Sequence, residues 1–149
     1  MKNTSIFNTL RKDHDIQRDL VSKLVETTGE SEERKLIFNK LKHELAIHAN
    51  AEERFFYKPL IAADLTQEKA RHGIAEHHEM DELIEKMDST EMSSAHWLKL
   101  AKDLAHEVKH HLKEEEHEIF QLAGKVLTEN KKEDLGIAYL DYINANRVA

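Results

Sequence analysis

Apolar residues recur at spacings of three and four along most of the chain, the period that is typical of amphipathic helices. The first such stretch runs from Ile6 to about Val25 and stops before Gly29, a residue common just past a helix end. The second begins at Ser31, which is suited to an N-cap, and Pro59 is expected to bring it near its end. The first part of the chain therefore predicts two long helices.

The rest of the chain repeats this pattern. Thr66 is a candidate cap for a third helix, and Ser93 or Ser94 for a fourth that ends near Leu127. The segment from Lys131 to Ile143 predicts a shorter fifth helix. Because its apolar face is weaker, we expect it to pack outside the other four.

Long helices joined by short connections favour an all-α fold, an antiparallel up-down-up-down four-helix bundle with a short additional C-terminal helix. The 149 residues suit a single domain, 1–149, with the bundle over about 5–127 and the last helix over about 130–145. Only 4 Gly and 1 Pro interrupt the pattern, which agrees with long helices.

Charge and hydropathy exclude two classes of partner. The 22 basic residues are scattered among 29 acidic ones, for a formal net charge of -7, so no basic surface for nucleic acid is expected. There is no run of about 18 apolar residues, and the N-terminus turns polar too soon for a secretory signal. We expect a cytoplasmic protein that binds neither nucleic acid nor membrane.

The chain has 11 histidines and no cysteine. Thiolate zinc sites, iron-sulfur clusters and cysteine nucleophiles are therefore excluded, and any metal must be held by nitrogen and oxygen.

In two of the predicted helices, the same polar residues interrupt the apolar seam, which is the stripe of residues expected to face the bundle core. The second helix has His48 and Glu52 there, and the fourth has His111 and Glu115. The sequence from His48 to Phe56 aligns without gaps with the segment that begins at His111, which indicates an internal pseudo-repeat. Residues four apart share one helix face, so each helix offers one imidazole and one carboxylate to a common point.

The other two helices each add one histidine on the seam, His14 in the first and His77 in the third. Four histidines and two glutamates would then meet in the bundle core. Because buried carboxylates without a cation cost several kcal/mol each, this pattern predicts a metal site, with two divalent ions bridged by Glu52 and Glu115.

The His-x-x-x-Glu spacing is common in a chain this rich in both residues. It occurs off the seams in three further pairs, His72/Glu76, His78/Glu82 and His110/Glu114. We interpret these as solvated pairs that stabilise their helices slightly. The pattern alone leaves two registers open, His77 against His78 and His111 against His110.

The order of these residues resembles that of the hemerythrin-like proteins with the HHE cation-binding domain. It runs from one His to a His-x-x-x-Glu motif, then to another single His and a second His-x-x-x-Glu motif. The resemblance covers about residues 5 to 125. Family-like context surrounds the candidate ligands, in Leu10–His14, Glu52–Pro59, Glu76-His77 and Glu115–Phe120. It implies a pair of non-haem irons bridged by the two carboxylates, with zinc or manganese as substitutes in preparations.

One position departs from the oxygen-carrying hemerythrins, which have a second histidine one turn before the ligand of the third helix. Gly73 stands there in this chain. Unless Glu53 or Glu116 adds a ligand, both irons keep open positions. The resemblance then implies binding or reduction of dioxygen, nitric oxide or peroxide, in oxidative or nitrosative stress and with an unknown redox partner. Whether this is enzymatic stays open; if so, the protein is a di-iron oxidoreductase.

Two other functions stay open from the sequence. One is an iron donor or store of the type that repairs iron-sulfur clusters, and the other is a structural bundle with zinc or no metal. A ferritin-like site is disfavoured because both Glu-x-x-His pairs, Glu107/His110 and Glu114/His117, lie in the fourth helix. Gln17 and Tyr57 are candidates for hydrogen bonds to ligands, although packing is the simpler role for Tyr57. The chain is expected to be a monomer or a homodimer.

Overall fold

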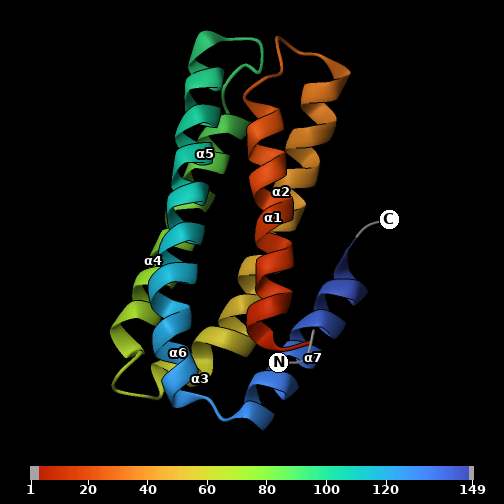
Figure 1. Ribbon diagram of the computed structural model, residues 1–149. Helices are drawn as coiled ribbons and strands as arrows, with labels where there is room; N and C mark the ends of the chain where they lie inside the picture. The colour runs from red at the N-terminus through yellow and green to blue at the C-terminus, as the bar shows by residue number, and fades with distance from the viewer. Residues whose placement is uncertain (1–3, 148–149) are drawn as a thin grey trace.

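The computed structural model describes residues 4–147, and this part of the chain is helical without a strand. Four long helices run side by side in alternating directions (Figure 1), α1 (Ile6–Leu24), α2 (Glu32–Glu52), α4 (Gln67–Asp88) and α5 (Ala95–Glu114). The prediction of an all-α four-helix bundle is therefore confirmed. None of the described helices is both long and apolar enough to cross a membrane.

Two of the long helices continue through a π-helical turn into a short α-helix. After α2 come η1 (Glu53–Tyr57) and α3 (Lys58–Ile61), and after α5 come η2 (Glu115–Ile119) and α6 (Phe120–Val126). Helical structure thus runs past Pro59 to the end of α3. Proline is tolerated there because it lies in the first turn of α3, where a missing N–H costs little.

The helix starts follow the expected capping residues with one exception. The hydroxyls of Ser31 and Ser94 accept hydrogen bonds from backbone N–H groups three residues on. Thr66 precedes α4, but its hydroxyl instead donates to the carbonyl oxygen of Leu60 at 2.6 Å. It therefore fastens the turn between α3 and α4. Gly29, with φ of 57°, makes the turn between α1 and α2.

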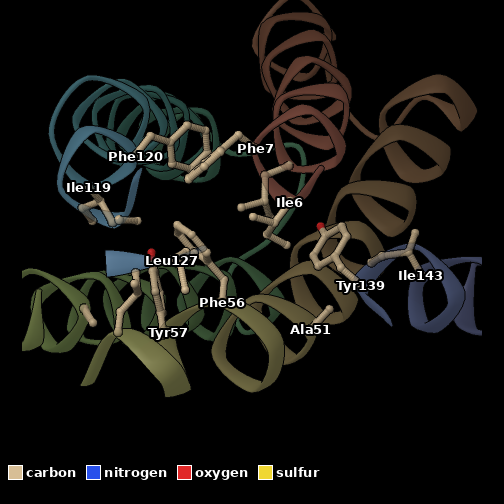
Figure 2. Packing of buried hydrophobic residues seen from close by; sticks show 14 of the residues in the cluster. Ile6, Phe7, Ala51, Phe56, Tyr57, Ile119, Phe120, Leu127, Tyr139 and Ile143 are labelled. Carbon is tan, nitrogen blue, oxygen red and sulfur yellow. The ribbon is translucent and has the colours of Figure 1, made fainter. Parts of the chain in front are cut away.

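The last helix, α7 (Glu129–Asn146), is 18 residues long and packs across α1 and α2 at one end of the bundle (Figure 1). It is more than an outer addition, because Tyr139 and Ile143 are 1% exposed and point inward (Figure 2). Gly136 permits the close approach, since a Cβ atom there would lie 1.8 Å from the carbonyl oxygen of Thr4.

The buried apolar residues form two clusters with a polar layer between them. One cluster fills the end of the bundle near α7, where the rings of Phe7, Phe56 and Phe120 meet with centroids 5.1–6.1 Å apart (Figure 2). The other lies toward the opposite end and includes Phe38 and Trp97. Between the clusters lie ten buried polar residues: Asp13, His14, Gln17, Glu44, His48, Glu52, Glu76, His77, His111 and Glu115.

Candidate metal centre

The polar layer brings the six predicted ligands to one place in the bundle. Each of the four long helices supplies one histidine, while one glutamate ends α2 and the other begins η2. All six side chains are at most 5% exposed: His14, His48, Glu52, His77, His111 and Glu115. The sequence left open His77 against His78 and His111 against His110. In the structure His77 and His111 are buried, whereas His78 and His110 are exposed.

The two oxygens of Glu52 face two different histidines. Oε2 lies 3.4 Å from Nε2 of His48, and Oε1 lies 3.1 Å from Nε2 of His77. A carboxylate with one imidazole at each oxygen has the arrangement of a bridge between two ions.

Glu115 repeats this arrangement with the other two histidines. Its Oε1 lies 3.2 Å from Nε2 of His14, and its Oε2 lies 3.4 Å from Nε2 of His111. Donors on bonds of about 2.0–2.2 Å around one ion lie about 2.8–3.6 Å apart, so these distances suit shared ions. The donors thus divide into two sets, each with two imidazole nitrogens and one oxygen from each glutamate.

Most of these donor atoms make no hydrogen bond to the described part of the chain. Within residues 4–147, the buried atoms without a partner include Nε2 of all four histidines, both oxygens of Glu52 and Oε1 of Glu115. Buried polar atoms are seldom left unpaired, and here they point at one another. A pair of cations between them accounts for every one of these atoms, so the residues fit a two-metal centre.

The outer nitrogen of each imidazole is fixed by a hydrogen bond. Three Nδ1 atoms face carboxylates: His14 with Glu116 at 2.7 Å, His77 with Glu53 at 2.8 Å and His111 with Glu76 at 2.8 Å. Such bonds set the tautomer that leaves Nε2 free for a metal. The carboxylates of Glu53 and Glu116, which the sequence left as possible ligands, therefore lie on the outer side of the imidazoles.

The fourth imidazole is held by the last helix. Nδ1 of His48 lies 2.6 Å from the hydroxyl of Tyr139, which donates in turn to Asp13 at 2.5 Å. Because the hydroxyl proton is directed at Asp13, the imidazole must be the donor in the first bond. Arg147 completes the chain of contacts by pairing with both Asp13 and Glu44 at 2.9–3.0 Å. Sequence reasoning predicted His48 as a ligand and included Asp13 only in the family-like segment before His14, and it missed Tyr139, Glu44 and Arg147.

In the metal-free centre, buried carboxylates hold protons on the neighbouring imidazoles. Burial alone would lower the pKa of His14, but the carboxylates of Glu115, Glu116 and Glu52 raise it to about 10. The pKa of His77 is likewise raised, to about 9, against the effect of burial. Without cations, the layer balances its carboxylates with imidazolium protons, and a metal must displace them.

Comparison with known proteins agrees with this geometry. The family model for the hemerythrin HHE cation binding domain matches residues 5–123, most of the chain. The chain belongs to this family. A solved structure of a hemerythrin HHE cation binding domain-containing protein from Mycobacterium kansasii is similar with a TM-score of 0.85 and 24% identity, over 95% of this chain and 86% of that one. This likeness supports the hemerythrin-like fold. No match was found among curated proteins.

The space beside Gly73 in this hemerythrin-like chain is filled by a tyrosine. A Cβ atom on Gly73 would lie 2.5 Å from the hydroxyl oxygen of Tyr57, so the phenol occupies the space beside this glycine. The hydroxyl donates a hydrogen bond to Oε2 of Glu115. Burial, together with the negative charges of Glu115 and Glu52, raises the pKa of Tyr57 well above its ordinary value, which keeps the proton on the phenol. The tyrosine therefore contacts a candidate ligand in addition to packing.

A narrow cavity of about 10 Å³ opens beside the candidate metal centre, enough for roughly one water-sized molecule. Its lining includes His48 from one donor set, and His77 and His111 from the other. Gln17 lines the same cavity, and within the described residues its side-chain nitrogen has no hydrogen-bond partner. The chain thus offers a free amide donor next to the centre.

Proposed function

We propose that this chain holds two iron ions bridged by Glu52 and Glu115 and that it binds or reduces a small oxidant there: dioxygen, nitric oxide or peroxide. The observation that carries the proposal is the division of eight donor atoms into two equal sets that share both carboxylates. Four imidazole nitrogens and four carboxylate oxygens are donors that suit iron. Iron often takes more than four ligands, so this donor set leaves positions for a small molecule.

The surroundings of the centre support a small, uncharged or weakly charged ligand. The cavity beside it has room for little more than one water molecule, which favours a ligand of a few atoms over an organic substrate. Burial of the whole layer keeps bulk water away from the centre. Iron held by these residues would supply the electrons for reducing an oxidant, and an unknown redox partner would restore them.

Two side chains of the protein have defined tasks in this proposal. Gln17 donates a hydrogen bond from its amide nitrogen to a small molecule in the cavity, which fixes its orientation. Tyr57 holds a proton on its hydroxyl against Oε2 of Glu115 and so keeps that carboxylate in its bridging position. The carboxylates behind the imidazoles raise the basicity of the nitrogens that face the metals.

The first experiment measures metal content and reactivity on the same protein. Protein expressed with added iron and purified without oxygen should contain two irons per chain, and a Glu52→Ala/Glu115→Ala variant should lose them. The reduced protein is then mixed with dioxygen, nitric oxide or hydrogen peroxide while its optical spectrum is recorded. A spectral change on oxidation with at least one of them is expected. No change with any of the three contradicts the proposal.

A second variant tests the ligand position without touching the iron ligands. Gln17→Leu keeps the volume of the side chain and removes the amide donor. We expect unchanged iron content, with weaker binding or slower reaction of the small molecule.

Retention of iron through repeated reduction and reoxidation distinguishes this function from iron donation, in which the metal passes to an acceptor.

A further inference from the structure

A second group of metal-binding side chains lies between α4 and α5, on the surface of the bundle. Nε2 of His72 lies 3.5 Å from Oε2 of Glu76 and 3.4 Å from Oε1 of Glu114. His110 approaches the same two carboxylates, with Nε2 3.2 Å from Oε2 of Glu114 and 4.0 Å from Oε2 of Glu76. Both i,i+4 pairs that the sequence predicted, His72/Glu76 and His110/Glu114, are therefore formed with half-exposed histidines, but Glu76 is buried and the two pairs also contact each other between α4 and α5, which pack side by side (Figure 1).

The spacing of these atoms suits one tetrahedral ion. Ligands on bonds of about 2.0–2.2 Å in a tetrahedron lie about 3.3–3.6 Å apart, and Nε2 of His72 lies 3.5 Å from Oε2 of Glu76 and 3.4 Å from Oε1 of Glu114. Nε2 of His110 lies 3.2 Å from the other oxygen of Glu114, Oε2. Donor atoms of His72, Glu76 and Glu114 all lie within 4.8 Å of one another. His110, with 57% of its side chain exposed, has room to turn the remaining distance.

Burial separates this group from an ordinary acidic surface. The side chain of Glu76 is only 7% exposed and that of Glu114 is 18% exposed, whereas both histidines are more than half exposed. The group therefore combines two largely buried carboxylates with two imidazoles that are accessible to solvent. A surface cavity of about 380 Å³ adjoins the His110 side of the group and is lined by His110, Lys113, Glu114, His117 and Glu118.

Glu76 also connects this group to the buried centre. Its Oε1 accepts a hydrogen bond from Nδ1 of His111 at 2.8 Å, while its Oε2 faces the surface histidines. One oxygen thus orients a candidate ligand of the buried pair and the other is left for the surface group. The hydrogen bond also holds the carboxylate in place, so a surface ion would meet an ordered donor.

We propose that His72, Glu76, His110 and Glu114 form a separate surface site for one divalent cation of the borderline class, such as Zn²⁺ or Fe²⁺. Two imidazoles and two carboxylates match the preference of these ions for mixed nitrogen and oxygen donors. The site does not depend on oxidant chemistry at the buried centre.

The test is a zinc titration of the iron-loaded protein. Equilibrium dialysis against Zn²⁺, with zinc and iron both counted by mass spectrometry, is carried out on the wild type and on His72→Ala/His110→Ala. This variant leaves Glu76 and its bond to His111 in place, and both replaced side chains are exposed, so the fold is preserved. The control variant His78→Ala/His106→Ala removes two exposed histidines from the same two helices.

We expect the wild type and the control to bind one more Zn²⁺ per chain than His72→Ala/His110→Ala does, at equal iron content. Since loss of a mere supporting group weakens metal sites by about 10–100-fold, loss of two direct donors should weaken this one by at least as much. Co²⁺ bound in place of zinc should show the intense visible bands of tetrahedral coordination, absent from the variant. Equal zinc binding by the wild type and the variant overturns the proposal.

Discussion

Replacing Tyr139 by phenylalanine removes one oxygen atom and two buried hydrogen bonds. The hydroxyl accepts from Nδ1 of His48 at 2.6 Å and donates to Asp13 at 2.5 Å, and the phenol is 1% exposed. Asp13 keeps its pairing with Arg147, whereas the imidazole N–H is left buried without a partner. An unpaired buried donor costs about 1–3 kcal/mol.

The variant should lower the stability of the metal-free fold by about this amount and should also lower the affinity for iron. Loss of a group that orients a metal-binding histidine typically costs 10–100-fold in metal affinity, which is about 1.4–2.7 kcal/mol. Competition with a coloured chelator under argon gives the affinity for Fe²⁺, and thermal unfolding of the metal-free protein gives the stability.

Tyr142→Phe is the matched control, because this tyrosine lies on the same helix and packs on Phe55 with ring centroids 6.0 Å apart. It should bind iron as the wild type does. If Tyr139→Phe also binds iron with wild-type affinity, α7 does not support the centre and the reasoning is refuted.

Three further predictions concern glycines and pH. Gly136→Ala should destabilise the protein by more than about 1 kcal/mol in denaturant unfolding, because its Cβ would overlap the backbone that precedes α1, whereas Gly124→Ala, with nothing within 4 Å, should stabilise it slightly. Gly73→Ala should displace the Tyr57 ring and destabilise the protein, and a Tyr57→Ala background should remove most of this effect in a double-mutant cycle. The metal-free fold raises the pKa of His14 to about 10, so this histidine contributes stability that is full below its unfolded pKa of about 6.5 and lost as pH rises toward 10. Unfolding by guanidinium should therefore show a less stable metal-free protein at about pH 9 than at about pH 6, and the opposite order contradicts the assignment.

The bundle and the positions of the candidate ligands could be predicted because both follow from helix periodicity. His48 and Glu52 share a seam with apolar residues, and that seam must face the core whatever the neighbouring helices are. Periodicity does not predict which residues of different helices contact each other. Glu76 was interpreted as solvated, yet packing of α4 on α5 buries it against His111.

The contribution of α7 was missed for a related reason. Its apolar face is weak, and a helix judged by that face alone is expected to lie outside the core. Tyr139 instead reaches inward because its hydroxyl finds partners in the polar layer, and no pattern within α7 indicates those partners. The helical structure reaches Pro59 and α3 through a π turn, which has no clear signal in sequence either.

The two π turns also bear on how the length of this chain can change. A π turn closes its hydrogen bond over five residues, one more than an α turn, as in the bonds from Lys58 to Glu53 and from Phe120 to Glu115. Deleting one residue inside such a turn would restore an α-helix and leave both flanking segments facing the core as before. A deletion elsewhere in α2 or α5 would turn every later residue of that helix by about 100°. Relatives of this chain are therefore expected to differ from it by single-residue gaps just after Glu52 and Glu115, where evolution can lengthen or shorten a helix without rotating its faces.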